Sequence, residues 1–406
     1  MKKNLVLLFL VQISNYVFPL ISMPYLIRIL GVTNFGMIAI FMAIIQFINI
    51  IIDFGFSFTA TRSISVVKND KEQVSRIFSK TIYAKIIILL FFIFFIGLTI
   101  FLNEYRDYYL YYLLGVVFCF FSIFECIWLY QGIDRIQIFA NISLISKTLV
   151  FISIFYFVNN QEDLIYAFIC SCMGSILCGF ISLLFILKFN LSKFYKVNIL
   201  DVIYWLKSSL DIFLANFTIS FYTALNIIVV GYFYGPTIAG FFSAADKIRL
   251  AAQGLLTPLQ QLLFPKVSVL LSQGNTYVYV LKKYGIKVIG FGAFISLMLL
   301  LLGYPFCLKY FGDGFELTGK ILMFLSPIPF IVSIGMVFGQ WFLIGTKKDR
   351  ILRNVYIIFS SIHLILLTPF ILLFKNYGVA ISILVTELLI SLTFIYFYFK
   401  TLEKKT

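Results

Sequence analysis

Charged residues are scarce in this chain of 406 residues. Asp, Glu, Lys and Arg make up 12% of the sequence, whereas hydrophobic residues make up 62%. A soluble domain carries about 25% charged and about 45–50% apolar residues. The composition therefore excludes an ordinary soluble protein, and no stretch poor in apolar residues is long enough to form a soluble domain. The excess of apolar surface must face lipid.

Residues that commonly hold metals or perform catalysis are also few. Histidine occurs once, and the six cysteines all fall inside apolar runs. Cys170 and Cys172 do not have zinc-ligand spacing. The Walker A, HExxH and nucleophile-elbow patterns are absent, and Gly345–Lys348 lacks the upstream glycine of a phosphate-binding loop. We predict a protein that is not an enzyme and that has no metal site and no cofactor.

The net charge of +15 does not indicate a nucleic-acid partner. A nucleic-acid-binding protein gathers its basic residues into a patch or stripe. Here the basic residues lie in short clusters between apolar runs. Such clusters are typical of the cytoplasmic loops of membrane proteins, which carry an excess of Lys and Arg.

Twelve apolar runs are long enough to cross a bilayer, which takes about 20 residues. The predicted spans are residues 5–30, 36–60, 79–102, 108–131, 138–158, 164–187, 207–233, 237–264, 286–308, 318–344, 354–374 and 378–399. The eighth is the least regular, because Asp246, Lys247 and Arg249 lie well inside it. We predict an all-α, polytopic membrane protein with about 12 transmembrane helices.

The Lys and Arg residues also predict the orientation. If the N-terminus is inside, 23 of the 32 lie on the cytoplasmic side and 5 on the outer side. The excess of basic residues marks the cytoplasmic side. We therefore expect a multi-pass protein of the bacterial inner membrane with both termini in the cytoplasm.

Several ionisable groups lie within the predicted spans. A charge at the bilayer centre costs about 2.5–3.5 kcal/mol even on the insertion scale, so such groups normally face a cavity or a partner. They are Asp53, Glu125, Lys147, Asp211, Asp246, Lys247, Arg249, His363 and Glu387. Each either lines a cavity or forms an internal pair that fixes helix packing. Lys85 is also in a span, but we expect it to reach the interface by snorkelling.

Spacing separates some of these groups. Glu125 and Lys147 lie at similar depths, so they form either a structural or a functional pair. Asp246 and Arg249 share a helix face because they are three residues apart. Lys247 points elsewhere, and the resulting local charge of +1 suits a polyanionic substrate such as a diphosphate.

The single histidine has two interpretations. A lone His363 in a span is commonly a packing residue whose hydrogen bonds are satisfied. If Glu387 of the next span lay beside it, the pair would instead resemble a proton relay.

Six motifs in order along the chain resemble those of the Wzx-type O-antigen and polysaccharide flippases. They are Leu30–Gly36 (LGVTNFG), Asp53–Phe56 (DFGF), Ala60–Arg62 (ATR), Trp128–Gly132 (WLYQG), Ala239–Ile248 (AGFFSAADKI) and Leu263–Pro265 (LFP). The resemblance covers nearly the whole chain. These flippases belong to the multidrug/oligosaccharidyl-lipid/polysaccharide exporter superfamily.

The resemblance implies two six-helix lobes around a central cavity. We expect the lobes at residues 1–187 and 208–406, joined by a cytoplasmic linker at 188–207. It also implies transport of an undecaprenyl-diphosphate-linked oligosaccharide, a repeat unit of O-antigen or polysaccharide, to the periplasmic leaflet. Ion-coupled alternating access would use H⁺ or Na⁺.

The resemblance also implies which side chains take part. Candidates for a cationic, substrate-binding cavity are Arg28, Arg62, Lys147, Lys247 and Arg249. Candidates for ion coupling are Asp53, Glu125, Asp211, Asp246, His363 and Glu387. Asp211 departs from the family pattern, in which we expect an apolar residue or proline.

Three alternatives fit the sequence less well. A drug/cation antiporter of the same superfamily would need an acidic cavity, whereas the charges within the fifth and eighth spans are mainly cationic. An O-antigen polymerase or ligase would carry its chemistry on a large outer loop, and the predicted outer loops are short. A structural membrane protein would not need so many charges within its spans.

Overall fold

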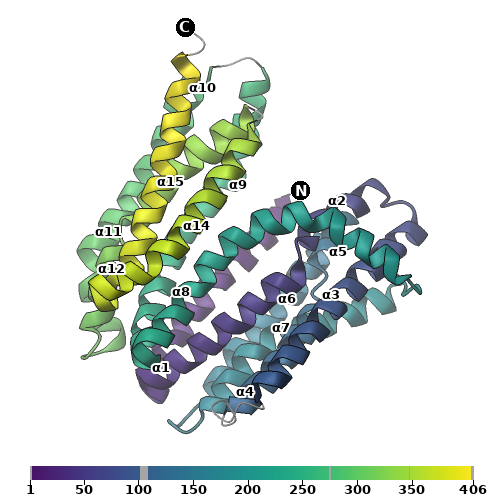
Figure 1. Cartoon of the computed structure of the whole chain (residues 1–406), viewed down its shortest axis with the longest axis horizontal. Coiled ribbons are helices and arrows are strands. Elements are labelled where there is room, and N and C mark those ends of the chain that lie inside the picture. Colours follow the sequence, from purple (N-terminus) through teal and green to yellow (C-terminus); the bar gives the residue numbers. More distant parts are fainter. Residues whose placement is uncertain (1, 101–107, 274–275, 347, 404–406) are drawn as a thin grey trace. The chain divides into compact units, whose positions relative to one another are not determined.

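The computed structural model describes residues 2–100, 108–273, 276–346 and 348–403, and every regular element in these ranges is a helix (Figure 1). The predicted all-α class is therefore confirmed. Nine helical segments in the described part of the chain are long and apolar enough to cross a membrane. The chain is a multi-pass membrane protein.

Three of these segments are long enough to cross a bilayer twice. Ser14–Val66, Ala224–Leu271 and Arg350–Thr401 contain 53, 48 and 52 residues, and one crossing takes about 20. Each is interrupted where the sequence predicts a short outer connection, at Gly31, at Gly235 and at Lys375–Tyr377. The total of twelve crossings remains a prediction.

Two of these connections depend on glycine. Gly31 has φ 77° and ψ 163°, and Gly235 has φ 79° and ψ 175°. This combination is essentially restricted to glycine, because any Cβ would clash with the backbone. The helix continues on both sides of each glycine, so one residue redirects the chain.

The chain forms two compact units, residues 1–228 and 229–406. The first contains α1 (Lys2–Asp53), α2 (Phe56–Val66), α3 (Lys71–Ile100), α4 (Tyr109–Ser122), α5 (Ile127–Gly132), α6 (Ile136–Phe157), α7 (Leu164–Lys188) and the first part of α8 (Ile199–Gly254). The second contains the rest of α8, α9 (Leu256–Ser272), α10 (Tyr277–Val280), the π-helix η2 (Leu281–Gly285), α11 (Ile286–Phe311), α12 (Glu316–Leu325), α13 (Ile328–Ile334), the π-helix η3 (Gly335–Ile344), α14 (Asp349–Phe374), the short η4 (Lys375–Tyr377) and α15 (Gly378–Glu403).

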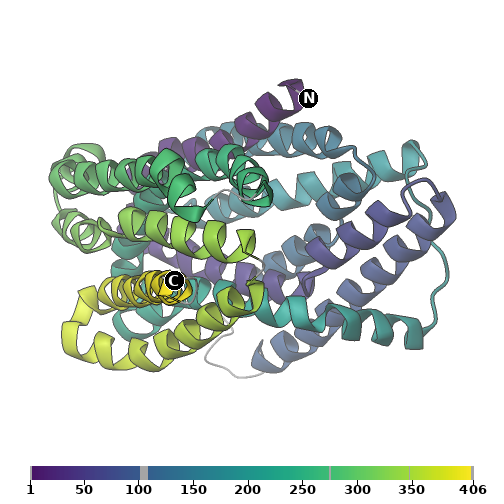
Figure 2. The same ribbon diagram turned by 90° about the horizontal axis from the view of Figure 1, so that it is seen from above.

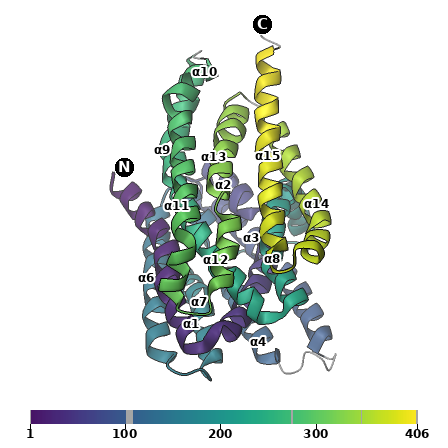
Figure 3. The ribbon, with the colours of Figure 1, turned by 90° about the vertical axis from the view of Figure 1, so that its left-hand side faces the viewer.

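Each unit is held together by packed helix pairs. In the first, α7 packs against α4 and α6, and α1 packs against α6 (Figure 2). In the second, α14 packs against α15 and α11 packs against α12 and α13 (Figure 3). Aromatic side chains form much of the second core, including Trp341, Phe342, Phe394 and Tyr398.

The predicted linker is attached to the first unit. Residues 189–198 are non-helical. The backbone N–H of Lys193 donates to Ser75 Oγ at 3.0 Å, and that of Tyr195 donates to Ser79 Oγ at 2.8 Å, so this segment lies on α3. The residues of α8 up to Ile228 also group with the first unit. The lobe boundary at residues 188–207 remains a prediction.

Among the predicted spans that contain no proline, two are broken in the described part of the chain. The span at 36–60 is interrupted by Phe54 and Gly55, with φ 46° and 73°, and the span at 108–131 is interrupted at residues 123–126. No proline marks either break. The short helices α2 and α5 follow these breaks, and they pack against each other.

Candidate functional site

An open recess of about 570 Å³, with both polar and apolar lining, lies on α2 and α5. Its lining includes one cation, three hydroxyls and one amide, together with two apolar side chains. The lining residues are Ser57, Phe58, Thr61, Arg62 and Ser65 of α2 and Ile127 and Gln131 of α5.

The sequence of α2 explains why one of its faces is polar. Phe56, Ala60 and Ile64 are fully buried and follow each other at intervals of four residues. Side chains at this spacing lie on one face of a helix. The hydroxyls that line the recess have the same spacing and lie on an adjacent face. An amphipathic helix of 11 residues therefore directs its hydroxyls and Arg62 into the recess.

Close contacts join α2 to α5. Thr61 Oγ1 donates to the Trp128 carbonyl at 3.3 Å. A Cβ built on Gly132 would lie 2.5 Å from Ile64 Cγ2, so the two helices are closer than any larger residue permits. Beyond the helix ends, Lys68 Nζ lies 2.6 Å from Asp134 Oδ2 in an exposed ion pair. The recess is thus built on a two-helix pair.

Arg62 supplies the positive charge of the recess. Its side chain is exposed, and it forms no ion pair with any residue that the structure describes. A guanidinium offers five N–H donors in a planar arrangement that fits phosphate oxygens. The recess can therefore bind an anion, with hydroxyls and an amide beside it for neutral polar groups.

Asp53 lies next to the recess but is paired. Its carboxylate is 2.8 Å from Lys85 Nζ and accepts a hydrogen bond from Ser57 Oγ at 3.0 Å. Lys85 is only 5% exposed, so the expectation that it snorkels is wrong. The reason is that the Asp53 carboxylate of α1 holds the Lys85 ammonium inside the protein, since charged groups within spans pair with one another.

Glu125 and Lys147 interact electrostatically, but their hydrogen bonds go elsewhere. Glu125 is hydrogen-bonded to Ser175, and it also interacts electrostatically with Lys85. Lys147 Nζ donates to Asn15 Oδ1 of α1. The two residues belong to one charged region of the first unit without forming an ion pair with each other.

In the second unit, Arg249 is held by its own helix. Its guanidinium donates to Asp246 Oδ1 at 2.8 and 2.6 Å and to Gln253 Oε1 at 2.6 Å, and the residue is 8% exposed. This confirms that Asp246 and Arg249 share a helix face. Lys247, which lies between these two residues in the sequence, is half-buried.

His363 is completely buried among hydroxyl groups. Its Nδ1 lies 2.9 Å from Thr386 Oγ1 and 3.2 Å from Ser382 Oγ, both on α15. These contacts favour the packing interpretation. Glu387 is half-buried on the same helix and interacts electrostatically with Tyr356 of α14.

Two further candidates from the sequence, Arg28 and Asp211, remain to be located. Arg28 is exposed on α1, and the side chain of Asp211 lies outside the described part of the structure. Sequence reasoning missed the hydroxyls and the amide around Arg62, whose alignment depends on the break before α2. Among the described residues, no group of three or more His, Cys, Asp or Glu side chains could hold a metal ion.

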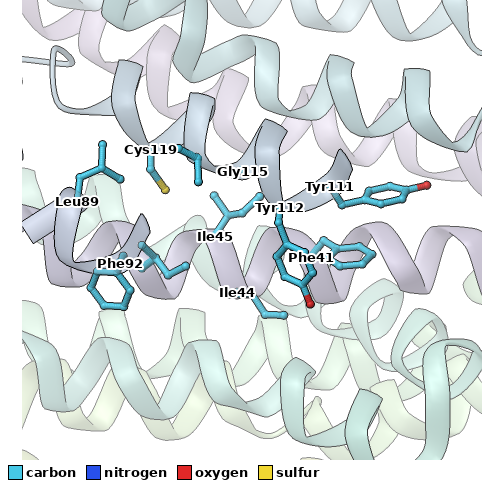
Figure 4. A pocket seen from close by; sticks show the side chains of 11 residues that line it. Phe41, Ile44, Ile45, Leu89, Phe92, Tyr111, Tyr112, Gly115 and Cys119 are labelled. Atoms are coloured by element: carbon cyan, nitrogen blue, oxygen red, sulfur yellow. The ribbon is translucent and has the colours of Figure 1, made fainter. Parts of the chain in front are cut away.

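A second pocket in the first unit is apolar and has no charged group in its lining (Figure 4). It lies between α1, α3 and α4. Phe41 stacks on Tyr111 at one end, with ring centroids 4.7 Å apart, and Cys119 and Leu89 line the other end. We interpret it as a packing feature of the helix bundle.

The sequence of this chain is similar to those of known proteins. Residues 1–271 match the family described as polysaccharide biosynthesis protein. Proteins provisionally named O-antigen transporter are 32% identical in Shigella dysenteriae and 30% identical in Escherichia coli strain K12. The first match covers 97% of this chain and 98% of the relative, and the second covers 96% and 95%.

Solved structures show a similar fold. The lipid II flippase MurJ, in an inward closed conformation, superposes with a TM-score of 0.76 at 18% identity, over 96% of this chain and 86% of that one. A multidrug resistance transporter of the MATE family, in an inward-facing conformation, gives 0.71 at 14% identity, over 96% of each chain. At these identities the likeness concerns the fold.

Proposed function

Because this chain belongs to the polysaccharide biosynthesis protein family, we propose that it is a flippase that moves a lipid-linked oligosaccharide across the bacterial inner membrane. Two relatives that match nearly its whole length bear the provisional name O-antigen transporter. The fold is similar to that of a lipid II flippase. The proposed role is transport, with no catalysed reaction.

One observation ties this function to particular residues: the recess contains an exposed arginine that has no ion partner among the described residues. An undecaprenyl-diphosphate carries about two negative charges beside its first sugar. Arg62 can bind two phosphate oxygens at once, while Thr61 and Gln131 can bind sugar hydroxyls. The recess lies at the predicted cytoplasmic ends of the second and fourth spans, where such a lipid would load.

We infer that transport is coupled to entry of H⁺ or Na⁺. Asp53 and Asp246 are engaged in ion pairs, so we assign coupling to the other acidic and histidine candidates, Glu125, Asp211, His363 and Glu387. Lys147 in the first unit and Lys247 in the second would each offer a cation to the diphosphate. Arg249, fixed by Asp246, would act by shaping α8.

A drug/cation antiporter is the second candidate, because MATE transporters share this fold. An exposed arginine would repel a cationic drug at the recess. The electrostatics of the first unit therefore favour an anionic, lipid-linked substrate.

Substitution of Arg62 tests the proposal. In cells that make the cognate polysaccharide but lack the chromosomal copy, Arg62→Ala should reduce surface polysaccharide by about 10- to 100-fold, the loss expected for a hydrogen-bonded charge pair worth about 1.5–3 kcal/mol. Protein abundance should stay near that of the wild type, because the side chain is exposed. Lipid-linked repeat units should accumulate in the cytoplasmic leaflet.

Arg76→Ala is the matched control. Arg76 is an exposed arginine on α3 that is paired with Glu72 and lies outside the recess, so its loss should leave surface polysaccharide unchanged. Wild-type export by Arg62→Ala, at wild-type abundance, would show that the recess does not bind the substrate.

A further inference from the structure

The recess lies directly after two breaks in transmembrane helices. At the first, Phe54 and Gly55 adopt positive φ between α1 and α2. At the second, residues 123–126 are non-helical, and short-range hydrogen bonds such as Ile127 N–H to the Glu125 carbonyl replace the helical pattern. Broken helices within a membrane need neighbours that satisfy the freed backbone groups.

An acidic residue lies at each break. Asp53 is the last residue of α1, and its carboxylate accepts hydrogen bonds from both the backbone N–H and the hydroxyl of Ser57. The N-cap of α2 is Gly55, and Asp53 places a negative charge beside the first turn of this helix, where negative charge is favourable. Glu125 lies in the second break, just before α5.

Lys85 of α3 contacts the acid at the first of these breaks. Its Nζ is 2.8 Å from the Asp53 carboxylate. The side chain is 6% exposed and does not line the recess. Lys85 is therefore separate from the lining around Arg62, although it contacts Asp53, which directly precedes the helix that carries Arg62.

We propose that Lys85 is a positioning residue for transport, because it fixes α2, and with it the α2–α5 pair, to α3 through the Asp53 carboxylate at the first helix break. The proposal rests on the proposed function of the recess. Contacts between α2 and α5 keep these helices together. The Asp53–Lys85 ion pair fixes the position of these two helices relative to the rest of the first unit. Ser57, bonded to Asp53, is itself part of the recess lining.

A charged pair is a poor choice if only stability matters. Removing two charges from water costs about as much as their attraction returns, and apolar replacement of a buried pair is often neutral for stability. Apolar contacts already hold this region, since Phe54 stacks on Phe213 of α8 with ring centroids 4.2 Å apart. The ion pair adds a fixed geometry between helices, which apolar packing does not specify.

The decisive variant is Lys85→Met combined with Asp53→Asn. Both charges disappear together, so neither is left buried without its partner. The amide oxygen introduced at position 53 can still accept from Ser57. We expect near-normal abundance and thermal stability, with surface polysaccharide reduced by about 10-fold or more. Lys85→Arg, which retains the charge, should restore part of the export.

A labelling experiment reports the geometry directly. Thr61→Cys replaces a half-buried recess residue, and the six native cysteines are all buried. A water-soluble maleimide should react with the thiol introduced at this position several-fold faster in the Lys85→Met/Asp53→Asn background, because α2 is no longer fixed to α3. An unchanged rate together with unchanged export would overturn the proposal.

Controls separate this inference from the proposed function. Lys68→Met/Asp134→Asn removes an exposed ion pair at the other ends of the same two helices, and exposed pairs contribute little, so export should not change. Normal export in the Lys85 double variant, with loss in Arg62→Ala, sinks the positioning role alone. Normal export in both the Lys85 double variant and Arg62→Ala would show that the recess is not the substrate site. Loss of export in proportion to protein abundance assigns Lys85 to folding.

Discussion

Lys247 and Arg249 are two residues apart on α8 but have different surroundings. Arg249 is nine-tenths buried and bonded to Asp246 and Gln253, whereas Lys247 is half-buried on another face of the helix. From the sequence alone, loss of either cation should abolish export without loss of protein. The observed pairing of Arg249 changes that expectation for one of the two.

We predict opposite phenotypes for the two alanine variants. Arg249→Ala leaves Asp246 without its ion partner, and breaking a buried pair costs about 3–5 kcal/mol, so protein abundance and melting temperature should fall. Lys247→Ala should keep abundance and lose export by about 10-fold. Immunoblotting beside surface-polysaccharide staining distinguishes them. Equal loss of protein in both variants would contradict a transport role for Lys247.

At the scale of helices, the crossing of α7 and α4 is unusually close beside the second helix break. A Cβ built on Gly179 of α7 would lie 1.9 Å from the carbonyl oxygen of Phe121, the next-to-last residue of α4. Backbone cannot move aside as a flexible side chain can. Gly179 is therefore required for α7 to support the end of α4, and through it the position of α5.

We predict that Gly179→Ala destabilises the protein, because overpacking costs about 1–3 kcal/mol and here forces helices apart. Gly174→Ala is the control on the same helix: its Cβ would meet Val150 Cγ2 at 3.5 Å, an ordinary contact. Thermal unfolding in detergent should show a lower melting temperature for Gly179→Ala only. Similar values for the two variants would refute the close crossing.

At the scale of the whole molecule, the distribution of Lys and Arg predicts where each connection lies. Reporter fusions at Asn69, Asn190 and Lys348 should be cytoplasmic, and fusions at Asn160 and Gly314 periplasmic. All five positions are outside helices in the structure, so a fusion there does not cut a span. A reporter on the opposite side at any of them would contradict the twelve-span topology.

Three short connections between spans could be predicted from the sequence because their signals are local. Apolar runs end at Gly31, Gly235 and Lys375–Tyr377, and the chain turns there. The Asp246–Arg249 pair could be predicted for the same reason, because a spacing of three residues places both side chains on one helix face.

The helix breaks depend on distant partners and could not be predicted in this way. A Cβ on Gly55 would lie 2.9 Å from the backbone nitrogen of Phe213, about 160 residues later in the chain. The Asp53–Lys85 pair was missed because its residues are 32 positions apart on different helices, and their contact depends on how α1 packs against α3. A hydropathy pattern marks each apolar run but not which runs are neighbours.

The Asp53–Lys85 pair also bears on how the chain enters the membrane. Asp53 leaves the ribosome before Lys85, and a lone carboxylate within a span costs about 2.5–3.5 kcal/mol to insert. If α1 and α2 insert before α3 is made, the Asp53 carboxylate enters the membrane without Lys85, and the full insertion cost applies. If the insertion machinery retains Asp53 until α3 arrives, the two charges enter the lipid as a neutral hairpin. The ion pair thereby makes biogenesis of the second span depend on synthesis of the third.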